Sequence, residues 1–517
     1  MGGPNITEGP AGRREPIGGR RVTLCDPALD FRDFVSTLLE RKDAVRIGTE
    51  VSPHLEAAAI TRRVYDTRSP APLFENLTGA APGFRLLGAP AGLSGPGTEF
   101  GRVAAHIGLA PTATARDIVE HLVRAMHAEP IAPRVVDKGA VQENIRTGAD
   151  VDLEQFPVPL LHQQDGGRYF GTYGYHIVQT PDGSWTSWSI SRSMLHSRNT
   201  LVGPAMPQQH LGMIHRMWQE RGRPTPWAFV AGAPPASLVA AGMPLPEHIN
   251  EDGYVGALAG RPVDVVRAQT NDLYVPANAE IVLEGYISPD ETAPEGPMGE
   301  YHGYQFDDPR EQPVFHVEAI THRNDPILPF CVAGVPPEEN HTIWGTMISA
   351  VALDVLRSNG LPIDMAWCSY EAATCWIVLS VDLDELRRNP TTQSELVDAV
   401  AGVLFSSHVG WLVPKILLVA NDLDVTDITD VAWALATRHH PATGTYRFDD
   451  APGIPLVPYL SADDRAAGRG GKAIVSCLQP TQLAGVTSGS TANFDNAFPD
   501  AVRERVLRNW SSYGFDS

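Results

Sequence analysis

A glycine-rich decapeptide, EGPMGEYHGY at 295–304, places two carboxylates in a segment that can turn tightly. Glu295 and Glu300 lie five residues apart, and three glycines in the decapeptide let the backbone approach a ligand closely. An acid that Met298 and its aromatic neighbours shield from water would have a raised pKa and would deliver a proton near neutral pH. The alternative is a glycine-rich β-turn with solvated acids. The pattern favours a proton donor in this loop.

Three further polar residues stand where chemistry is possible, although each alone is a weak signal. Arg192 follows a predicted strand at 185–190, where an arginine is more often a solvated edge residue. His210 begins a predicted amphipathic helix and is, in isolation, better explained as a capping or exposed histidine. Glu251 shortly precedes Gly253, a pattern typical of a turn. None of the three defines a site without the others.

Composition limits the classes of protein to consider. A chain of 517 residues with 43% hydrophobic and 20% charged residues predicts a soluble protein of two or three domains. No run approaches the roughly 20 apolar residues of a membrane helix, and residues 1–20 are predicted to be a flexible tail without a secretory signal. The net charge of −21 argues against nucleic acid. Five widely spaced cysteines indicate a reducing cytoplasm rather than a disulfide framework.

The periodicity of the chain predicts three domains that must position these residues. Helices at 31–40, 55–65 and 115–126 alternate with extended segments, which indicates an N-terminal α/β domain at 21–140. Irregular, proline-rich sequence then leads into a mostly antiparallel β-domain at 141–330. Its expected strands are 169–180, 185–190, 263–268, 280–287 and 314–321, with an Asp-Gly hairpin turn after the first. A C-terminal α/β domain at 331–517 is expected from helices at 343–356 and 396–405 and strands at 376–381 and 416–420.

Several motifs in order resemble the UbiD family of reversible decarboxylases over nearly everything after residue 30. They are WTSWSISR (185–192), PQQH (207–210), INEDGYVG (249–256), TNDLYVPANAEIVLEG (270–285), EGPMGEYHGY (295–304), GRGGKAIVSC (468–477) and NWSSYGF (509–515). The resemblance implies a split β-barrel between two α/β domains. It also implies a homodimer or higher homo-oligomer, in which the C-terminal domain takes part.

The resemblance also implies a cofactor, prenylated FMN, supplied by a flavin prenyltransferase and held through a divalent ion, commonly manganese, and potassium. The family's metal ligands, an asparagine, a histidine and a glutamate, match Ser187, His210 and Glu251. Ser187 departs from the pattern, and a hydroxyl is a poorer oxygen donor than an amide, so the affinity would be lower or a water would complete the shell. The implied cofactor contacts are Ser187, Trp188, Ser189, Ile190, Ser191, Arg192, Gln209, His210, Met243 and Glu251.

The family's catalytic residues match Arg192, Glu295 and Glu300 without substitution. By resemblance, Arg192 holds the substrate carboxylate and the polar edge of the flavin, and Glu295 supports Arg192. Glu300 would return a proton to the carbon that lost CO2. This agrees with the chemistry, because decarboxylation leaves electron density on carbon and needs an electrophilic sink and one positioned acid.

The substrate pocket departs from that of the ferulate and cinnamate decarboxylases. Those enzymes carry a threonine, an isoleucine, a lysine and a phenylalanine where this chain has Asn340, Trp344, His408 and Ile454; Leu456 completes the implied pocket. Asn340 and His408 are similar to the pair in pyrrole-2-carboxylate decarboxylases, which also share the serine at 187, and both could face a ring N–H. That group carries a phenylalanine at the position of Ile454, so the smaller side chain leaves room for indole carboxylate as well. The alternative is that Asn340 and His408 only satisfy backbone groups.

Three other functions stay open at this point. One is a decarboxylase of a cinnamate-like or ferulate-like α,β-unsaturated acid. Another is a flavin-binding split-barrel oxidoreductase, which would transfer hydride and have no need of Glu300. A cofactor-free scaffold protein is disfavoured by the intact set Arg192, Glu295 and Glu300.

Overall fold

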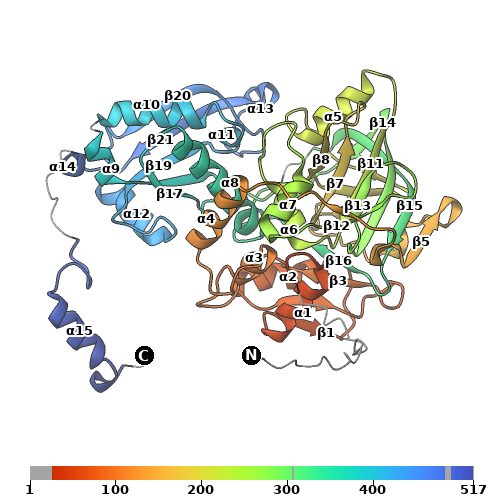
Figure 1. The fold of residues 1–517 in the computed structure, drawn as a ribbon, viewed down its shortest axis with the longest axis horizontal. Helices are drawn as coiled ribbons and strands as arrows, with labels where there is room; N and C mark the ends of the chain where they lie inside the picture. Colours follow the sequence, from red (N-terminus) through yellow and green to blue (C-terminus); the bar gives the residue numbers. More distant parts are fainter. Residues whose placement is uncertain (1–25, 306–307, 390, 484–490, 516–517) are drawn as a thin grey trace, which may run out of the picture.

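The computed structural model describes residues 26–305, 308–389, 391–483 and 491–515, so the predicted tail at 1–20 lies outside it. Figure 1 shows a small α/β layer, a curled central sheet and a second α/β layer, in agreement with the predicted mixture of helix and strand. Within the described ranges, no helix combines the length and the apolar character needed to cross a membrane.

The N-terminal layer is completed by a strand from far along the chain. Its sheet has the order β1-β2-β3-β16, and β16 (Ile327–Phe330) runs parallel to β3. The first helix begins where the Asp30 side chain accepts the backbone N–H groups of Arg32 and Asp33, as an N-cap should. The elements of this layer are α1 (Phe31–Glu40), β1 (Ala44–Ile47), α2 (Glu56–Thr67), β2 (Ala71–Phe74), β3 (Arg85–Gly88), α3 (Gly101–His106) and α4 (Ala115–Met126).

The central sheet has nine strands, all paired antiparallel, in the order β6-β9-β10-β15-β14-β11-β7-β8, with β5 beside β15. It curls into a half-barrel (Figure 1). The predicted hairpin is confirmed as β7 and β8. The strands are β5 (Asn144–Thr147), β6 (Tyr169–Gly171), β7 (Gly174–Gln179), β8 (Thr186–Ser189), β9 (Ser193–Ser197), β10 (Thr200–Val202), β11 (Thr225–Ala231), β14 (Ile281–Glu295) and β15 (Arg310–His322).

Two of the predicted strands differ from the structure. The run 169–180 is broken at Thr172 and Tyr173, where the chain leaves the ladder between β6 and β7 to line a cavity. The strand predicted at 263–268 lies outside the half-barrel, in a three-stranded sheet of order β13-β12-β4, because β12 pairs parallel to β4 from before the barrel. The sheet is formed by β4 (Arg134–Val135), β12 (Asp264–Arg267) and β13 (Tyr274–Pro276).

Helices fill the space between the half-barrel and the C-terminal layer. Of these, α6 (Pro235–Gly242) packs against α7 (Glu251–Ala259) and α8 (Glu339–Ser358), and α8 packs against β17. The helix α5 (His210–Gln219) instead packs on the half-barrel itself, against β7, β8, β11 and β14. One hydrophobic core runs from α4 through α6, α7 and α8 into the C-terminal sheet. The cavity described below lies where this core meets the barrel.

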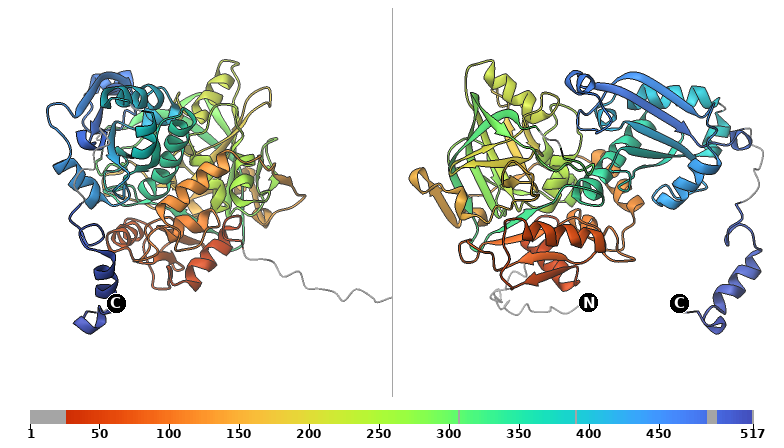
Figure 2. Two further views of the ribbon diagram at one scale, coloured as in Figure 1. Left: turned by 60° about the vertical axis from the view of Figure 1, so that its left-hand side comes forward. Right: turned by 180° about the vertical axis from the view of Figure 1, so that it is seen from behind.

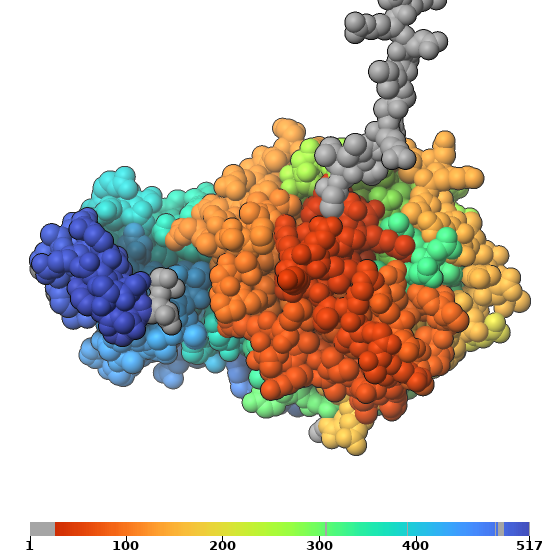
Figure 3. Space-filling view, turned by 90° about the horizontal axis from the view of Figure 1, so that it is seen from below, coloured from red at the N-terminus to blue at the C-terminus, as the bar shows by residue number. Residues whose placement is uncertain are grey.

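The C-terminal sheet has the order β17-β18-β19-β21-β20, parallel in its middle and antiparallel at both edges. Figure 2 shows it from behind, with the last helix standing away from the body, and Figure 3 shows that helix at one end of the molecule. No residue of that helix, α15, is buried. The elements are β17 (Ile363–Cys368), β18 (Trp376–Val381), α9 (Leu383–Arg388), α10 (Gln393–Leu404), α11 (His408–Leu412), β19 (Lys415–Ala420), α12 (Ile428–Thr437), β20 (Thr445–Pro452), α13 (Ala462–Ala467), β21 (Arg469–Ser476), α14 (Pro480–Leu483) and α15 (Asp500–Arg508).

Candidate active site

Arg192 joins two acids that come from a distant part of the chain. It lies between β8 and β9, and its Nε and Nη2 donate to the two carboxylate oxygens of Glu295 at 2.7 and 3.0 Å. Its Nη1 donates to Oε1 of Glu300 at 2.7 Å. The hydroxyl of Tyr169 donates to Glu295 Oε1 at 2.8 Å. The structure therefore brings the three predicted catalytic residues together through short, charge-assisted hydrogen bonds.

The loop that carries Glu300 is tight, as its glycines predict. The backbone N–H of Glu300 donates to the carbonyl of Tyr304, and the N–H of Gly303 donates back to the carbonyl of Glu300, both at 2.9 Å. Gly303 has a φ of +89°, a value that residues other than glycine rarely adopt. The loop is tied to the barrel where Gly299 donates to Asp165 Oδ1 at 3.0 Å. Glu300 is thus held in place by its backbone as well as by Arg192.

Burial and charge act against each other on the Glu300 carboxyl. Glu300 is only 7% exposed, and this burial raises its pKa above the usual value. The charge of Arg192 lowers the pKa in part, while neighbouring Glu295 raises it again. For Arg192, burial lowers the pKa but the two carboxylates outweigh it, so the pKa lies above its ordinary value and the guanidinium stays charged. The pair therefore combines a fixed cation with an acid that can carry a proton.

The side chains of Ser187, His210 and Glu251, which carry oxygen or nitrogen donor atoms, lie close together. Ser187 lies in β8, while His210 and Glu251 are the first residues of α5 and α7. Glu251 Oε1 lies 3.2 Å from His210 Nδ1 and 3.3 Å from Ser187 Oγ. The backbone N–H of Trp188 fixes the other oxygen of Glu251 at 2.9 Å. The turn suggested by Glu251 and Gly253 is instead a helix start, with Glu251 2% exposed.

This donor set fits a divalent cation. A carboxylate, a hydroxyl and an imidazole, with Glu251 and Ser187 buried, suit a hard ion such as Mn²⁺ better than a soft one. The ring of Trp185 packs edge-on against His210, with centroids 4.7 Å apart. The ring of His408 stacks on the same histidine at 6.3 Å. The three donor side chains are therefore partly shielded from water.

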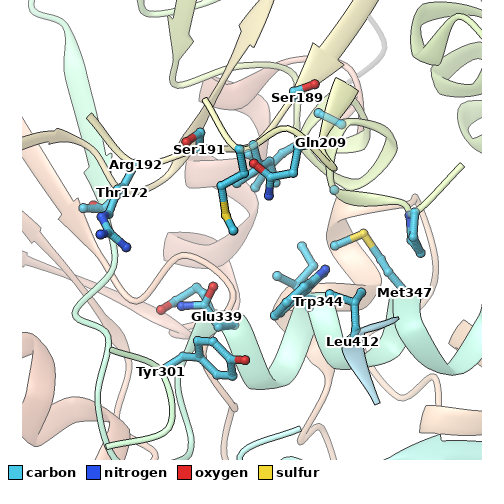
Figure 4. A pocket seen from close by; sticks show the side chains of 18 of the residues that line it. Thr172, Ser189, Ser191, Arg192, Gln209, Tyr301, Glu339, Trp344, Met347 and Leu412 are labelled. Carbon is cyan, nitrogen blue, oxygen red and sulfur yellow. The ribbon is translucent and has the colours of Figure 1, made fainter. Parts of the chain in front are cut away.

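A cavity of about 290 Å³ lies between the barrel and α8. Figure 4 shows Arg192 and Gln209 on one side of it and Glu339, Tyr301 and Trp344 on the other. Ser187 and Glu295 do not line it; they stand behind the wall and hold residues that do. The predicted residues that line it are Trp188, Ser189, Ile190, Ser191, Arg192, Gln209, His210, Met243, Glu251, Glu300, Asn340, Trp344, His408, Ile454 and Leu456.

The C-terminal layer contributes one wall of the cavity. His408 is the first residue of α11, and burial, aided by His210, lowers its pKa, so the ring is neutral. The backbone N–H of Ile454 donates to the carbonyl of Trp411 in the same helix at 3.2 Å, which holds Ile454 against α11. Ile454 is 5% exposed. The size of this wall is thus set by α11 and the segment after β20.

Sequence reasoning missed a buried acidic pair at the start of α8. Glu338 and Glu339 are 0% and 3% exposed. Glu339 lines the cavity and accepts hydrogen bonds from the Tyr65 hydroxyl and from the Ala91 N–H. Two acids at a helix start are ordinarily solvated and interact with the helix dipole, so the sequence gives no signal that these are buried. Tyr169, the hydrogen-bond donor to Glu295, was also missed.

Family models match most of the chain. The N-terminal, Rift-related and C-terminal domains of 3-octaprenyl-4-hydroxybenzoate carboxy-lyase match residues 35–122, 134–336 and 341–477. These three ranges include every residue of the predicted site except Asn340, which lies between the second and the third.

Whole-length relatives and solved structures agree with these models. The chain is 59% identical over 489 residues to a pyrrole-2-carboxylic acid decarboxylase of Pseudomonas aeruginosa, covering 94% of this chain and 99% of the relative. The closed form of a vanillic acid decarboxylase from Sedimentibacter hydroxybenzoicus is similar at a TM-score of 0.79 and 24% identity, covering 94% and 99%. An evolved dimeric form of the UbiD-class enzyme HmfF from Pelotomaculum thermopropionicum, in complex with prFMN, is similar at 0.73 and 25%, covering 87% and 95%.

Proposed function

Because this chain belongs to the UbiD family of carboxy-lyases, we propose that it reversibly decarboxylates a heteroaromatic acid such as pyrrole-2-carboxylate or indole-3-carboxylate. The observation that carries the proposal is the hydrogen-bonded set Arg192, Glu295 and Glu300 beside a cavity that Asn340 and His408 also line. The 59% identity to a pyrrole-2-carboxylic acid decarboxylase supports the substrate class.

Arg192 would bind the substrate carboxylate. Its Nε and one hydrogen on each terminal nitrogen are used by the two glutamates. No other residue in the described part of the chain takes the second hydrogen of Nη1 or of Nη2, so both can bind a ligand. Glu295 fixes the plane of the guanidinium by a bidentate contact. This would orient the bond between the ring carbon and the carboxylate before it breaks.

Glu300 would complete the reaction as proton donor. The ring carbon that loses CO2 must gain a proton in its place, and the Glu300 carboxyl would supply that proton. The raised pKa of this carboxyl favours the protonated form that the step requires. In the carboxylation direction the same carboxylate would accept the proton.

We propose prenylated FMN, a divalent ion such as Mn²⁺, and K⁺ as cofactors. Ser187, His210 and Glu251 would hold the divalent ion, with Ser187 acting directly or through a water. The segment from Trp188 to Arg192, with Gln209 and Met243, would line the flavin. When bound, the prenylated flavin supplies an electrophilic centre that accepts the electron pair of the breaking bond.

The cavity wall favours a ring with a nitrogen donor. Asn340 and His408 both line the cavity, and the His408 ring is neutral. Both side chains can therefore form a hydrogen bond with the N–H of an uncharged ring. Ile454 leaves more space than an aromatic residue would. An α,β-unsaturated acid is the second candidate, but its simplest member, cinnamate, has no ring N–H that would pair with Asn340.

A panel of acids tests the proposal. Protein coexpressed with a flavin prenyltransferase should release CO2 from pyrrole-2-carboxylate or indole-3-carboxylate faster than from cinnamate. Turnover of cinnamate alone would overturn the heteroaryl assignment. Nicotinamide-dependent hydride transfer without CO2 release would point to the oxidoreductase alternative.

We also propose a homodimer or higher homo-oligomer in the cytoplasm. The segment around α15 carries exposed apolar side chains, among them Leu507, Trp510 and Phe515, and no buried ones within the helix. Such a surface is more stable when a second copy covers it. Light scattering of the full chain would measure the assembly.

A further inference from the structure

The amide of Asn340 is held in one orientation by its neighbour Glu338. The Asn340 Nδ2 atom lies 3.2 and 3.1 Å from the two carboxylate oxygens of Glu338. The backbone N–H of Asn340 donates to the same carboxylate at 2.9 Å. The backbone N–H and the side-chain NH₂ group of Asn340 are therefore both directed at Glu338, and the carbonyl oxygen of the amide is turned away from that carboxyl.

The carbonyl oxygen is the side-chain atom that Asn340 can present to the cavity. Asn340 is half-buried and lines the cavity, and among the described residues none donates a hydrogen bond to its Oδ1. Asn340 Oδ1 is also not among the buried polar atoms that lack a hydrogen-bond partner in the described residues. The cavity therefore offers a hydrogen-bond acceptor at this point.

The position of Glu338 is itself fixed by the residues around it. It is fully buried and precedes α8 as the N-cap residue. Its backbone N–H donates to Nδ1 of His341 at 3.0 Å, and His341 Nε2 donates to the carbonyl of Tyr301 at 2.6 Å. Burial lowers the pKa of His341 to about 3, so the ring is neutral, and with Nε2 donating to Tyr301 its Nδ1 is an acceptor. Nδ1 lies 3.2 Å from Oε1 of Glu338, and burial raises the pKa of that carboxyl to about 8, so Glu338 keeps a proton that it can donate to Nδ1 while its oxygens accept from Asn340.

We propose that Glu338 is a positioning residue that turns the amide oxygen of Asn340 toward the substrate, so that the site selects rings that donate an N–H. This inference rests on the proposed function and deepens it. A pyrrole or indole N–H would pair with Oδ1. The oxygen of a furan would leave two acceptors facing each other in a partly dry cavity, which is unfavourable.

A purely structural role for Glu338 predicts something different. As the N-cap of α8 it would affect the free energy of unfolding, and its loss would lower the rate with every substrate by a similar factor. A positioning role instead changes the ratio of kcat/KM between two rings of the same shape. Pyrrole-2-carboxylate and furan-2-carboxylate form such a pair, because they differ in N–H against O.

The variant Glu338→Gln separates the two roles. Its amide oxygen can still cap the Asn340 N–H, while its NH₂ can donate to Asn340 Oδ1 and so allow the Asn340 amide to flip. The expected result in the flavin-loaded enzyme is a fall of at least about tenfold in the pyrrole-to-furan ratio of kcat/KM. The inhibition constant of furan-2-carboxylate should fall as well. An unchanged ratio in an active Glu338→Gln enzyme would overturn the proposal.

Three controls make the result specific. Glu284→Gln alters a buried acid in β14 that does not line the cavity, so the ratio should stay near that of the wild type. In an Asn340→Ala background, Glu338→Gln should have no further effect on the ratio. If Glu338→Gln does not fold, Glu338→Asp can still cap the helix but is one methylene shorter, and the same fall in ratio is expected.

The two levels of inference fail differently. A wild-type enzyme that turns over neither heteroaryl acid would overturn the proposed function, and the positioning role with it. Turnover of pyrrole-2-carboxylate with a ratio that Glu338→Gln leaves unchanged would overturn the positioning role alone.

Discussion

The Nη1 atom of Arg192 lies 2.7 Å from Oε1 of Glu300, and this single contact joins a permanently charged group to an acid with a raised pKa. The two groups have opposite requirements during turnover. Arg192 must remain a cation to hold a carboxylate, whereas Glu300 must take up and lose a proton. Because Glu295 occupies two other donors of the guanidinium, Arg192 stays in place when Glu300 is neutral.

Glu300→Gln should lower kcat for CO2 release by roughly 10²–10⁴-fold, because the proton donor is lost while the shape is kept. The KM should change little, since Arg192 still binds the carboxylate. Stopped-flow CO2 release measures this, with the exposed Glu291→Gln as control. A rate equal to that of the wild type would remove Glu300 from the reaction.

Arg192→Lys keeps the charge but loses the planar, bidentate contact with Glu295. We expect kcat/KM to fall by at least about 100-fold, because the substrate carboxylate is no longer aligned. The matched control is Arg198→Lys, at an exposed arginine nearby that pairs with Asp152. Equal kinetics for the two variants would contradict the assigned role.

Glu251→Gln should weaken Mn²⁺ binding by at least roughly 100-fold, since the only charged donor of the set becomes neutral. Electron paramagnetic resonance titration of the purified protein with Mn²⁺ measures the affinity without any turnover. Asp252→Asn, at the adjacent residue of α7, should bind Mn²⁺ like the wild type. An equal loss in both variants would show that the effect is general charge and not ligation.

Ile454→Phe should shift the substrate preference toward the smaller ring. The added ring volume fills part of the cavity, so kcat/KM for indole-3-carboxylate should fall by roughly 10-fold or more, with a smaller change for pyrrole-2-carboxylate. Ile454→Val, which enlarges the space, is the control. If both acids lose activity equally, Ile454 does not limit ring size.

The buried Glu338 predicts how stability depends on pH. Burial raises its pKa from about 4.5 to about 8, so the folded state binds its proton more tightly than the unfolded chain does. The stabilising contribution is complete below about 4.5 and is lost as the pH rises through about 8. Glu338→Gln does not ionise, so its melting temperature should fall less than that of the wild type between about pH 5 and about pH 8. A parallel decline in both proteins would contradict the raised pKa.

Local features of the fold were predictable where pattern and capping agree. The helices at 31–40 and 115–126 and the strand at 376–381 were predicted to the residue. For the second helix, Thr114 and Asp117 form a capping box just before a strongly amphipathic stretch. The motifs around Arg192 and Glu300 likewise indicated residues that the structure brings together.

Long-range relationships were not predictable from the same patterns. Ser187 and Glu251 are 64 residues apart in the sequence. They meet because the fold brings β8 and the start of α7 together. The burial of Glu338 depends on α8 passing between layers, which no local sequence signal reports. The break at Thr172 was missed because the alternation of apolar residues continues across it. Each of these depends on tertiary packing and not on local preference.

The position of β16 in the first sheet has a consequence for synthesis on the ribosome. Until residues 327–330 emerge, strand β3 is the open edge of that sheet, with unpaired backbone groups along Arg85–Gly88. The N-terminal layer therefore cannot be completed before the half-barrel has been translated. A chain that terminates early, near residue 140, would expose this edge and tend to aggregate.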